Sequence, residues 1–146
     1  MSELTVHHIL DSTLESVDRV ESLTLEVARR AGFRGVSLDQ IILAVHETAA
    51  NAVIHGNRYS REKKVSVAIS ITKNQLKITI DDEGEGFDPR TIPDPSSLQG
   101  LLQERGRGVY LCRALVDEYK VQLRDTGGTK VTLIKYLQCV IHGVSD

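Results

Sequence analysis

Residues 47–56 read Glu47-Thr48-Ala49-Ala50-Asn51-Ala52-Val53-Ile54-His55-Gly56 and form the second half of a predicted amphipathic helix. A helix start signal stands at residues 37–40, and apolar side chains recur at helical spacing after it. Glu47, Asn51 and His55 are four residues apart, so they form one polar stripe beside the apolar face. This stripe could line a cleft wall, or it could be an ordinary solvated helix face.

The segments upstream and directly downstream predict a strand, a helix and a hairpin. Residues 4–9 suit a short strand. Ser12-Thr13-Leu14-Glu15 offers a capping box to a helix that stops at Gly32. Residues 65–71 and 76–80 alternate apolar with mostly polar or small side chains, which is typical of the two arms of a β-hairpin.

The last third of the chain predicts one helix and a second hairpin. The helix is expected to begin near Gly108 and to run towards Asp117. The hairpin arms are residues 119–123 and 131–137, joined through Asp125-Thr126-Gly127-Gly128. The whole order of elements predicts an α+β fold, a two-layer α/β sandwich in which helices cover one face of a mostly antiparallel sheet.

Composition indicates a single domain over residues 1–146 and excludes several function classes. The 146 residues include 18 Lys+Arg and 20 Asp+Glu, so no basic surface for nucleic acid is expected. The longest apolar run, Ile41–Val45, is far shorter than the roughly 20 residues of a membrane span. No basic residue precedes Arg19, so no secretory signal is indicated and a cytoplasmic location is expected. Cys112 and Cys139 form neither a metal motif nor a redox motif.

A second patch of polar residues and glycines directly follows the first hairpin. It reads Asp81-Asp82-Glu83-Gly84-Glu85-Gly86-Phe87. Asp and Gly are common turn residues, so a surface turn is one interpretation. Alternatively, the glycines let the backbone approach a flat ligand, and an Asp carboxylate accepts a hydrogen bond from an exocyclic amine such as that of adenine.

A third patch, Arg105-Gly106-Arg107-Gly108-Val109, leads into the last predicted helix. Unpaired N–H groups and the positive end of the helix dipole suit a phosphate group at such a position. Many helices follow glycine, so this patch alone is a weak signal. The chain contains no GxxxxGK[ST] motif, and Ala50 interrupts the HExxH pattern that begins at His46.

Together the patches resemble, in order and spacing, the GHKL ATPases of the Bergerat fold. Residues 47–56 resemble the N box, residues 82–87 the first glycine box, and Gly106-Arg107-Gly108 the second. Gly127-Gly128-Thr129-Lys130-Val131 resembles the start of the final strand. Within the group, the small size, the NAxxHG ending of the N box and the short segment 88–105 most resemble the anti-sigma-factor serine/threonine kinases of bacteria.

The resemblance implies ATP and Mg²⁺ as cofactors and assigns roles to individual residues. Glu47 would be the general base, Asn51 would bind Mg²⁺, and Asp82 would bind the adenine amino group, supported by Thr129 through water. Gly84 and Gly86 would border the adenine, and residues 88–105 would form an ATP lid. Gly106 and Gly108 would lie beside the triphosphate, where Arg105 or Arg107 could neutralise charge.

The resemblance also implies a function. We expect a protein kinase that sequesters a sigma factor and phosphorylates a Ser or Thr of a STAS-domain anti-sigma-factor antagonist, and that forms a homodimer. Two alternatives stay open at this point. One is a non-catalytic switch that binds partners under nucleotide control, and the other is a co-activator subunit of a phosphatase or kinase pathway.

Overall fold

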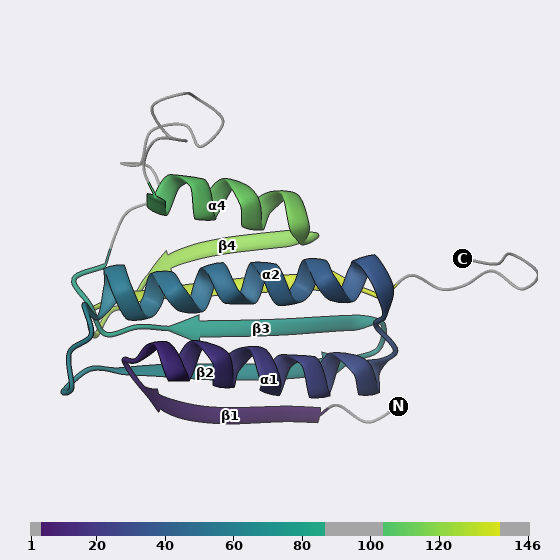
Figure 1. The fold of residues 1–146 in the computed structure, drawn as a ribbon, viewed down its shortest axis with the longest axis horizontal. Coiled ribbons are helices and arrows are strands. Elements are labelled where there is room, and N and C mark those ends of the chain that lie inside the picture. Colours follow the sequence, from purple (N-terminus) through teal and green to yellow (C-terminus); the bar gives the residue numbers. More distant parts are fainter. Residues whose placement is uncertain (1–3, 87–103, 138–146) are drawn as a thin grey trace, which may run out of the picture.

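The computed structural model describes residues 4–86 and 104–137, which form two layers (Figure 1). One layer is a five-stranded antiparallel sheet in the order β1-β2-β3-β5-β4. Its strands are β1 (Leu4–Asp11), β2 (Lys64–Thr72), β3 (Gln75–Asp81), β4 (Glu118–Leu123) and β5 (Thr129–Tyr136). The helices α1 (Leu14–Ala31), α2 (Gly35–Asn51) and α4 (Glu104–Leu115) cover one face, and the π-helix η1 (Ala52–Gly56) continues α2. The predicted fold class is confirmed.

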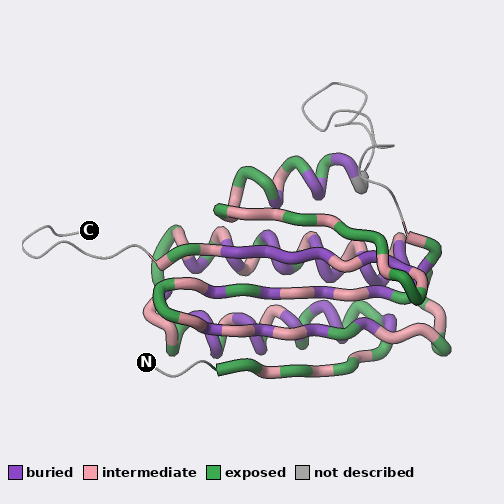
Figure 2. The backbone as a smooth tube through the Cα atoms, turned by 180° about the vertical axis from the view of Figure 1, so that it is seen from behind, coloured by how far each residue is buried: buried purple, intermediate pink, exposed green. Residues whose placement is uncertain are grey.

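The central strands form because their side chains alternate between the two faces of the sheet. Val67 and Ile69 of β2 pair in register with Ile80 and Ile78 of β3, and all four side chains are buried. Figure 2 shows buried positions along the central strands, whereas the edge strand β1 is mostly exposed or half-buried. The alternation read from the sequence therefore marks the face that packs against the helices.

The helices complete the core from the other side. Val20 of α1 and Ile41, Ala44 and Val45 of α2 are at most 1% exposed. Each fully buried branched side chain of this size contributes about 1.5–3 kcal/mol relative to an exposed one. Cys112 of α4 is also fully buried and joins the same cluster. α2 is therefore the central helix, packed between α1 and α4 above the sheet.

The start of α1 differs by one residue from the predicted capping box. Thr13 is the N-cap, and its Oγ1 accepts a hydrogen bond from the Ser16 backbone N at 3.2 Å. Ser12 is 3% exposed, and its hydroxyl donates to the Lys63 carbonyl at 2.5 Å. Ser12 is used for a tertiary contact, so the capping role moves to Thr13. Gly32 ends the helix in the left-handed region, with φ 102°, as the sequence predicts.

α2 starts earlier than predicted and ends in an unusual turn. It begins at Gly35, two residues before the expected signal at Ser37. After Asn51 the helix widens into η1, whose last hydrogen bond runs from the Asn57 N–H to the Ala52 carbonyl at 2.8 Å. Such i→i+5 turns are rare and frequently occur at functional sites.

Some sequence predictions fall on segments outside the described residues. These are Phe87, Cys139 and almost all of the predicted lid at residues 88–105. The backbone of residues 104 and 105 is part of α4, but the Arg105 side chain is also outside the description. Of the helices in residues 4–86 and 104–137, none has the length and apolar character that a bilayer crossing requires.

Candidate nucleotide-binding site

The end of α2 carries the residues predicted for catalysis and for the metal. Glu47 and Asn51 are one helical turn apart, and both side chains are half-buried. α4 packs against this part of α2. A Cβ placed on Gly108 would lie 3.1 Å from Asn51 Nδ2 and 3.5 Å from Glu47 Oε2. Glycine at position 108 therefore lets α4 approach both polar side chains.

His55 leaves the stripe that the sequence pattern predicted. It lies in η1, where the i→i+5 winding breaks the four-residue spacing that places Glu47 and Asn51 on one line. His55 does not line the pocket described below. The wide turn instead brings Gly56 against the Asp82 side chain.

Asp82 is held at the end of β3 by bonds from two neighbouring segments. It is 4% exposed, and its Oδ1 accepts hydrogen bonds from the backbone N of Gly84 at 3.0 Å and of Thr129 at 3.2 Å. Its own N–H donates to the Thr129 carbonyl at 2.9 Å, and its carbonyl accepts from Arg124 Nη1 at 2.7 Å. These bonds fix the position and rotamer of a buried carboxylate.

The glycines around Asp82 are required by close approach of chain segments. A Cβ on Gly84 would lie 2.1 Å from the Gly56 carbonyl oxygen, and a Cβ on Gly56 would lie 2.4 Å from Asp82 Oδ2. At Gly128 a Cβ would lie 2.0 Å from the Asp82 carbonyl oxygen, and its φ of 98° also favours glycine. The loop after β3 is therefore packed between η1 and the turn before β5.

The space beside Gly84 and Gly86 is occupied by protein atoms. At Gly84 the neighbour is the Gly56 backbone. At Gly86, a Cβ would lie 2.9 Å from Leu123 Cδ2 and 3.1 Å from the Gly128 carbonyl oxygen. Their role at the border of an adenine stays a prediction. The close packing by itself requires glycine at both positions, because a Cβ would clash with neighbouring protein atoms.

The second glycine pair lies inside a helix and not ahead of it. α4 begins at Glu104, four residues before the predicted start at Gly108. Glycine costs about 1 kcal/mol in a helix interior, so local propensity favours the later start, and packing against α2 overrides it. The first four N–H groups of a helix, from the N-cap to the third helical residue, have no partner within it, and in α4 the last of these belongs to Gly106.

A narrow, partly open pocket lies between α2 and the sheet. Its walls include Asn51, Asp82 and Thr129, three residues that the sequence assigned to one ligand. Five further residues line the pocket and were missed by the sequence analysis: Thr48, Ala52, Ile80, Tyr119 and Val131. Tyr119 could have been found from its place in the alternating pattern of β4, but no motif distinguishes it from other inward strand residues.

Charges beside the pocket are arranged around the neighbouring Asp81. Burial raises the pKa of the Asp81 carboxyl, and the positive charges of Lys130 and Arg124 partly oppose this effect. Arg124 Nε lies 3.6 Å from Asp81 Oδ2. Arg124 thus bonds the Asp82 backbone and faces Asp81, which ties the β4–β5 turn to the end of β3.

The oxygen donors at this site fit a metal ion that takes few ligands from the protein and most from phosphate and water. Within residues 4–86 and 104–137 no group of three His, Cys, Asp or Glu side chains could hold a metal. Asn51 supplies an amide oxygen, and Glu47 supplies a carboxylate one turn away. Mg²⁺ suits such a sparse donor set because it commonly keeps phosphate and water ligands.

The family model described as "Histidine kinase-like ATPase domain" matches residues 10–135. The chain is 34% identical over 135 residues to the "Serine-protein kinase RsbW" of Bacillus velezensis, covering 84% of this chain and 81% of that protein. It is also 34% identical over 125 residues to the protein of the same name from Bacillus subtilis, covering 79% and 75%.

A solved structure shares the fold. It contains the RsbU and RsbW domains of a Mycobacterium tuberculosis protein, with a TM-score of 0.69 and 22% identity. The match covers 97% of this chain and 35% of that longer one. At this identity the likeness concerns the arrangement of helices and strands alone.

Proposed function

Since this chain belongs to the histidine kinase-like ATPase domain family, we propose that it is an ATP-dependent serine/threonine protein kinase that acts as an anti-sigma factor. Two relatives that are 34% identical carry the name serine-protein kinase, and the alignment spans most of each chain. The observation that carries the proposal is the pocket in which Asn51, Asp82 and Thr129 meet beside Glu47.

The adenine end of the nucleotide is assigned to Asp82. Its carboxylate accepts a hydrogen bond from the exocyclic amine, and Thr129 supports the same edge of the base through water. The support for this assignment is that Asp82 is buried, held in one rotamer and part of the pocket wall. Apolar walls from Ile80 and Val131 suit the flat ring.

The phosphate end is assigned to the stripe on α2 and to the start of α4. Asn51 would hold Mg²⁺, which when bound neutralises charge on the phosphate oxygens. The N–H group of Gly106 at the start of α4 suits the triphosphate, and the exposed Arg107 adds positive charge there. The support is the contact between Gly108 and the side chains of Asn51 and Glu47.

Glu47 acts as the general base in the transfer step. Its carboxylate takes the proton from a substrate Ser or Thr hydroxyl as that oxygen forms a bond to the γ-phosphorus. The bond between this phosphorus and the β,γ-bridging oxygen breaks, and ADP leaves with the bridging oxygen. Positioning and charge neutralisation supply most of the rate in such reactions, and a base adds about 10²- to 10⁴-fold.

The protein substrate is a STAS-domain antagonist, and the sequestered partner is a sigma factor. We place the kinase in the cytoplasm, where sigma factors act, and infer that it works as a homodimer. The naming of the Bacillus relatives as serine-protein kinases supports a Ser-bearing protein substrate. Glu47, half-buried beside Asn51, supports the kinase over a non-catalytic switch.

The experiment is transfer from γ-labelled ATP with Mg²⁺ to a STAS-domain protein from the same genome. Wild type is compared with Glu47→Ala and Asp82→Asn, and ATP affinity is measured for all three by calorimetry. Wild type should label a Ser or Thr, Glu47→Ala should bind ATP without transfer, and Asp82→Asn should lose affinity. Full transfer by Glu47→Ala would refute the base assignment, and ATP binding by wild type without transfer to any STAS protein would favour the switch.

A further inference from the structure

Asn57 is a buried amide whose hydrogen-bonding groups are used by three separate segments. It is 1% exposed. Its Nδ2 donates to Ser12 Oγ at 2.9 Å and to the Lys64 carbonyl at 3.0 Å. Its Oδ1 accepts from the Glu83 backbone N at 2.8 Å. One side chain therefore joins the β1–α1 turn, the start of β2 and the loop after β3.

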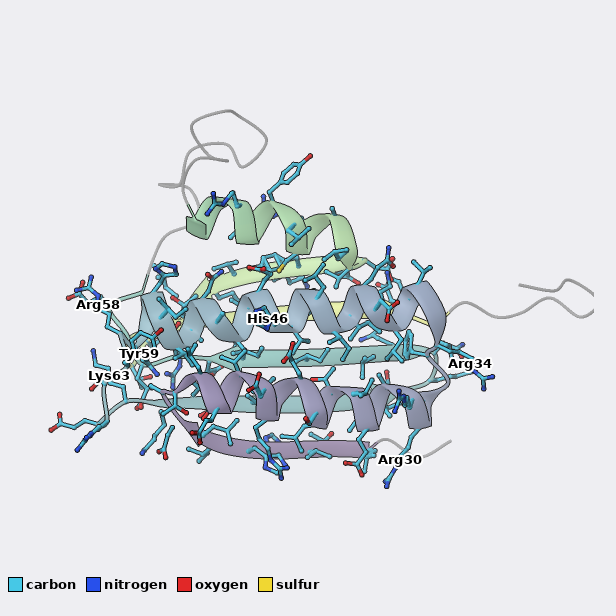
Figure 3. The ribbon with its side chains drawn as sticks, in the orientation of Figure 1. Arg30, Arg34, His46, Arg58, Tyr59 and Lys63 are labelled. Atoms are coloured by element: carbon cyan, nitrogen blue, oxygen red, sulfur yellow. The ribbon has the colours of Figure 1, made fainter. Side chains whose placement is uncertain are left out.

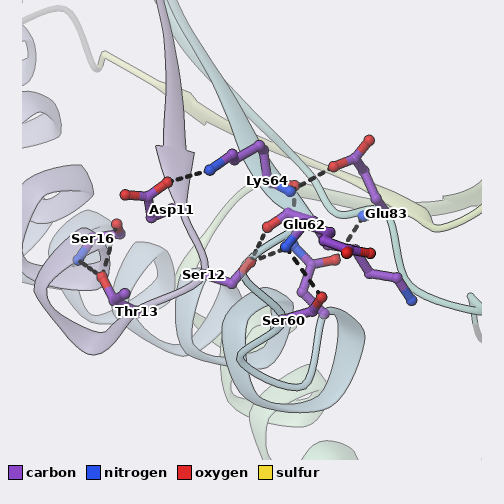
Figure 4. Close-up of polar contacts among 10 residues, drawn as sticks. Asp11, Ser12, Thr13, Ser16, Ser60, Glu62, Lys64 and Glu83 are labelled. Atoms are coloured by element: carbon purple, nitrogen blue, oxygen red, sulfur yellow. Dashed lines mark hydrogen bonds and ion pairs between the residues drawn. The ribbon is translucent and has the colours of Figure 1, made fainter.

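These bonds close into a ring, part of which is drawn in Figure 4. The Lys64 N–H donates to Glu83 Oε2, so Asn57, Lys64 and Glu83 each contact the other two. Ser12 extends the ring by donating to the Lys63 carbonyl. A closed set of bonds is stiffer than the same bonds in isolation, because none can shift without straining the others.

Asn57 differs in burial and backbone conformation from the two residues that follow it. The next residues, Arg58 and Tyr59, have φ values of 49° and 58° and are exposed. Their side chains lie with that of Lys63 at one end of the molecule (Figure 3). The Asn57 side chain is therefore buried, whereas the side chains of the next two residues are exposed. The left-handed conformation of those two residues costs energy.

The ring connects the two halves of the proposed nucleotide site. Asn57 directly follows η1, which continues the helix that carries Glu47 and Asn51. Its bond to the Glu83 N–H adjoins Asp82, whose carboxylate accepts from the Gly84 N–H. Asn57 thus joins the phosphate side to the adenine side without being part of the pocket wall.

We propose that Asn57 is a positioning residue that sets the Asp82 carboxylate relative to the end of α2. The inference rests on the proposed function, because it takes the pocket to bind ATP. Loss of the Asn57 side chain leaves the Glu83 N–H without its acceptor and frees the loop that carries Asp82. The base should then be held less firmly, and the preference for the adenine amino group should fall.

The test compares Asn57→Ala with wild type for affinity towards ATP and towards inosine triphosphate, which has a carbonyl oxygen in place of the amino group. ATP affinity should fall roughly tenfold, because one of the three lost hydrogen bonds, that to the Glu83 N–H, holds the loop that carries Asp82. Affinity for inosine triphosphate should fall less, so the preference for ATP shrinks. Thr24→Ala is the matched control, because Thr24 is equally buried and its hydroxyl donates to Val20 within α1.

The inference is overturned if Asn57→Ala keeps the ATP preference of wild type, or if Thr24→Ala loses that preference to the same extent. Ser12→Ala covers the case in which Asn57→Ala does not fold. It removes one anchor of the Asn57 amide, so ATP affinity should weaken partially, and unchanged affinity would overturn the inference.

Hydrogen exchange of the Glu83 amide separates this inference from the proposed function. If wild type binds no ATP, the proposed function fails, but the Asn57 link can still be tested. Protection of the Glu83 amide should be lost in Asn57→Ala and kept in Thr24→Ala. Protection that survives in Asn57→Ala would show that Asn57 does not hold the loop.

Discussion

A methyl group added at Gly56 should dislodge the Asp82 carboxylate. The new Cβ would lie 2.4 Å from Oδ2 and 2.5 Å from Cγ of Asp82, closer than real Cβ contacts. Gly56 has no positive φ, so Gly56→Ala causes no backbone strain of its own. The clash with Asp82 is therefore the main effect of the substitution.

The magnitude follows from what holds Asp82 in place. Its Oδ1 accepts from the backbone N of Gly84 and Thr129, so rotation away from the methyl group sacrifices two buried hydrogen bonds. At about 1–1.5 kcal/mol each, their loss costs about 2–3 kcal/mol of unfolding free energy. Replacing a helical glycine by alanine returns about 0.5–1 kcal/mol, which leaves a net loss of about 2 kcal/mol.

A double-mutant cycle with Asp82→Ala isolates the contact. The three atoms nearest to the added Cβ all belong to the Asp82 side chain beyond its Cβ. In the Asp82→Ala background, Gly56→Ala should therefore be neutral or slightly stabilising, measured by urea unfolding of all four proteins. ATP titration should show that Gly56→Ala alone weakens binding. Equal costs of Gly56→Ala in both backgrounds would refute the argument that Gly56 is needed to seat Asp82.

Three further perturbations test other parts of the structure. Thr13→Ala removes the N-cap of α1 and should lower the unfolding free energy by about 1 kcal/mol in urea unfolding, with ATP affinity unchanged, whereas a loss of affinity would contradict a purely capping role. Burial raises the pKa of the Cys112 thiol from 9.0 to about 11. The unfolded chain therefore loses this proton first as pH rises, and the stability of wild type relative to Cys112→Ala should decline between pH 9 and 11, by roughly 1.4 kcal/mol per pH unit. A flat difference between the two stability profiles would show that the thiol is not buried. Tyr119→Ala removes an aromatic wall of the pocket, so calorimetry should show weaker ATP binding, and wild-type affinity would exclude Tyr119 from the ligand site.

Local side-chain patterns were sufficient for the element order and the fold class. The two-residue period in β2 and β3 and the helical period in α1 and α2 each depend on neighbours within one element. The resemblance to the GHKL ATPases also marked Asn51, Asp82 and Thr129 for one ligand, and all three line the pocket. Their individual roles stay predictions, because they concern atoms of a bound nucleotide.

Element boundaries were less predictable, because tertiary contacts compete with local signals. Ser12 is a good N-cap residue by type, but its hydroxyl bonds Lys63, so Thr13 caps α1. Gly106 and Gly108 indicate a loop by propensity, but packing on α2 extends α4 back to Glu104. In both cases a partner distant in sequence decided the outcome.

The sequence by itself determined the layers and the strand pattern, because each is encoded by residue type and spacing along one segment. Its resemblance to the GHKL ATPases singled out the polar residues that are proposed to bind a nucleotide. Only the tertiary structure decided that Gly56 contacts Asp82 and that Asn57 bonds Ser12, Lys64 and Glu83. These contacts depend on distances between segments that the chain order does not encode. Asn57 has no periodic or motif signal, and its importance arises from burial with all three bonds made at once.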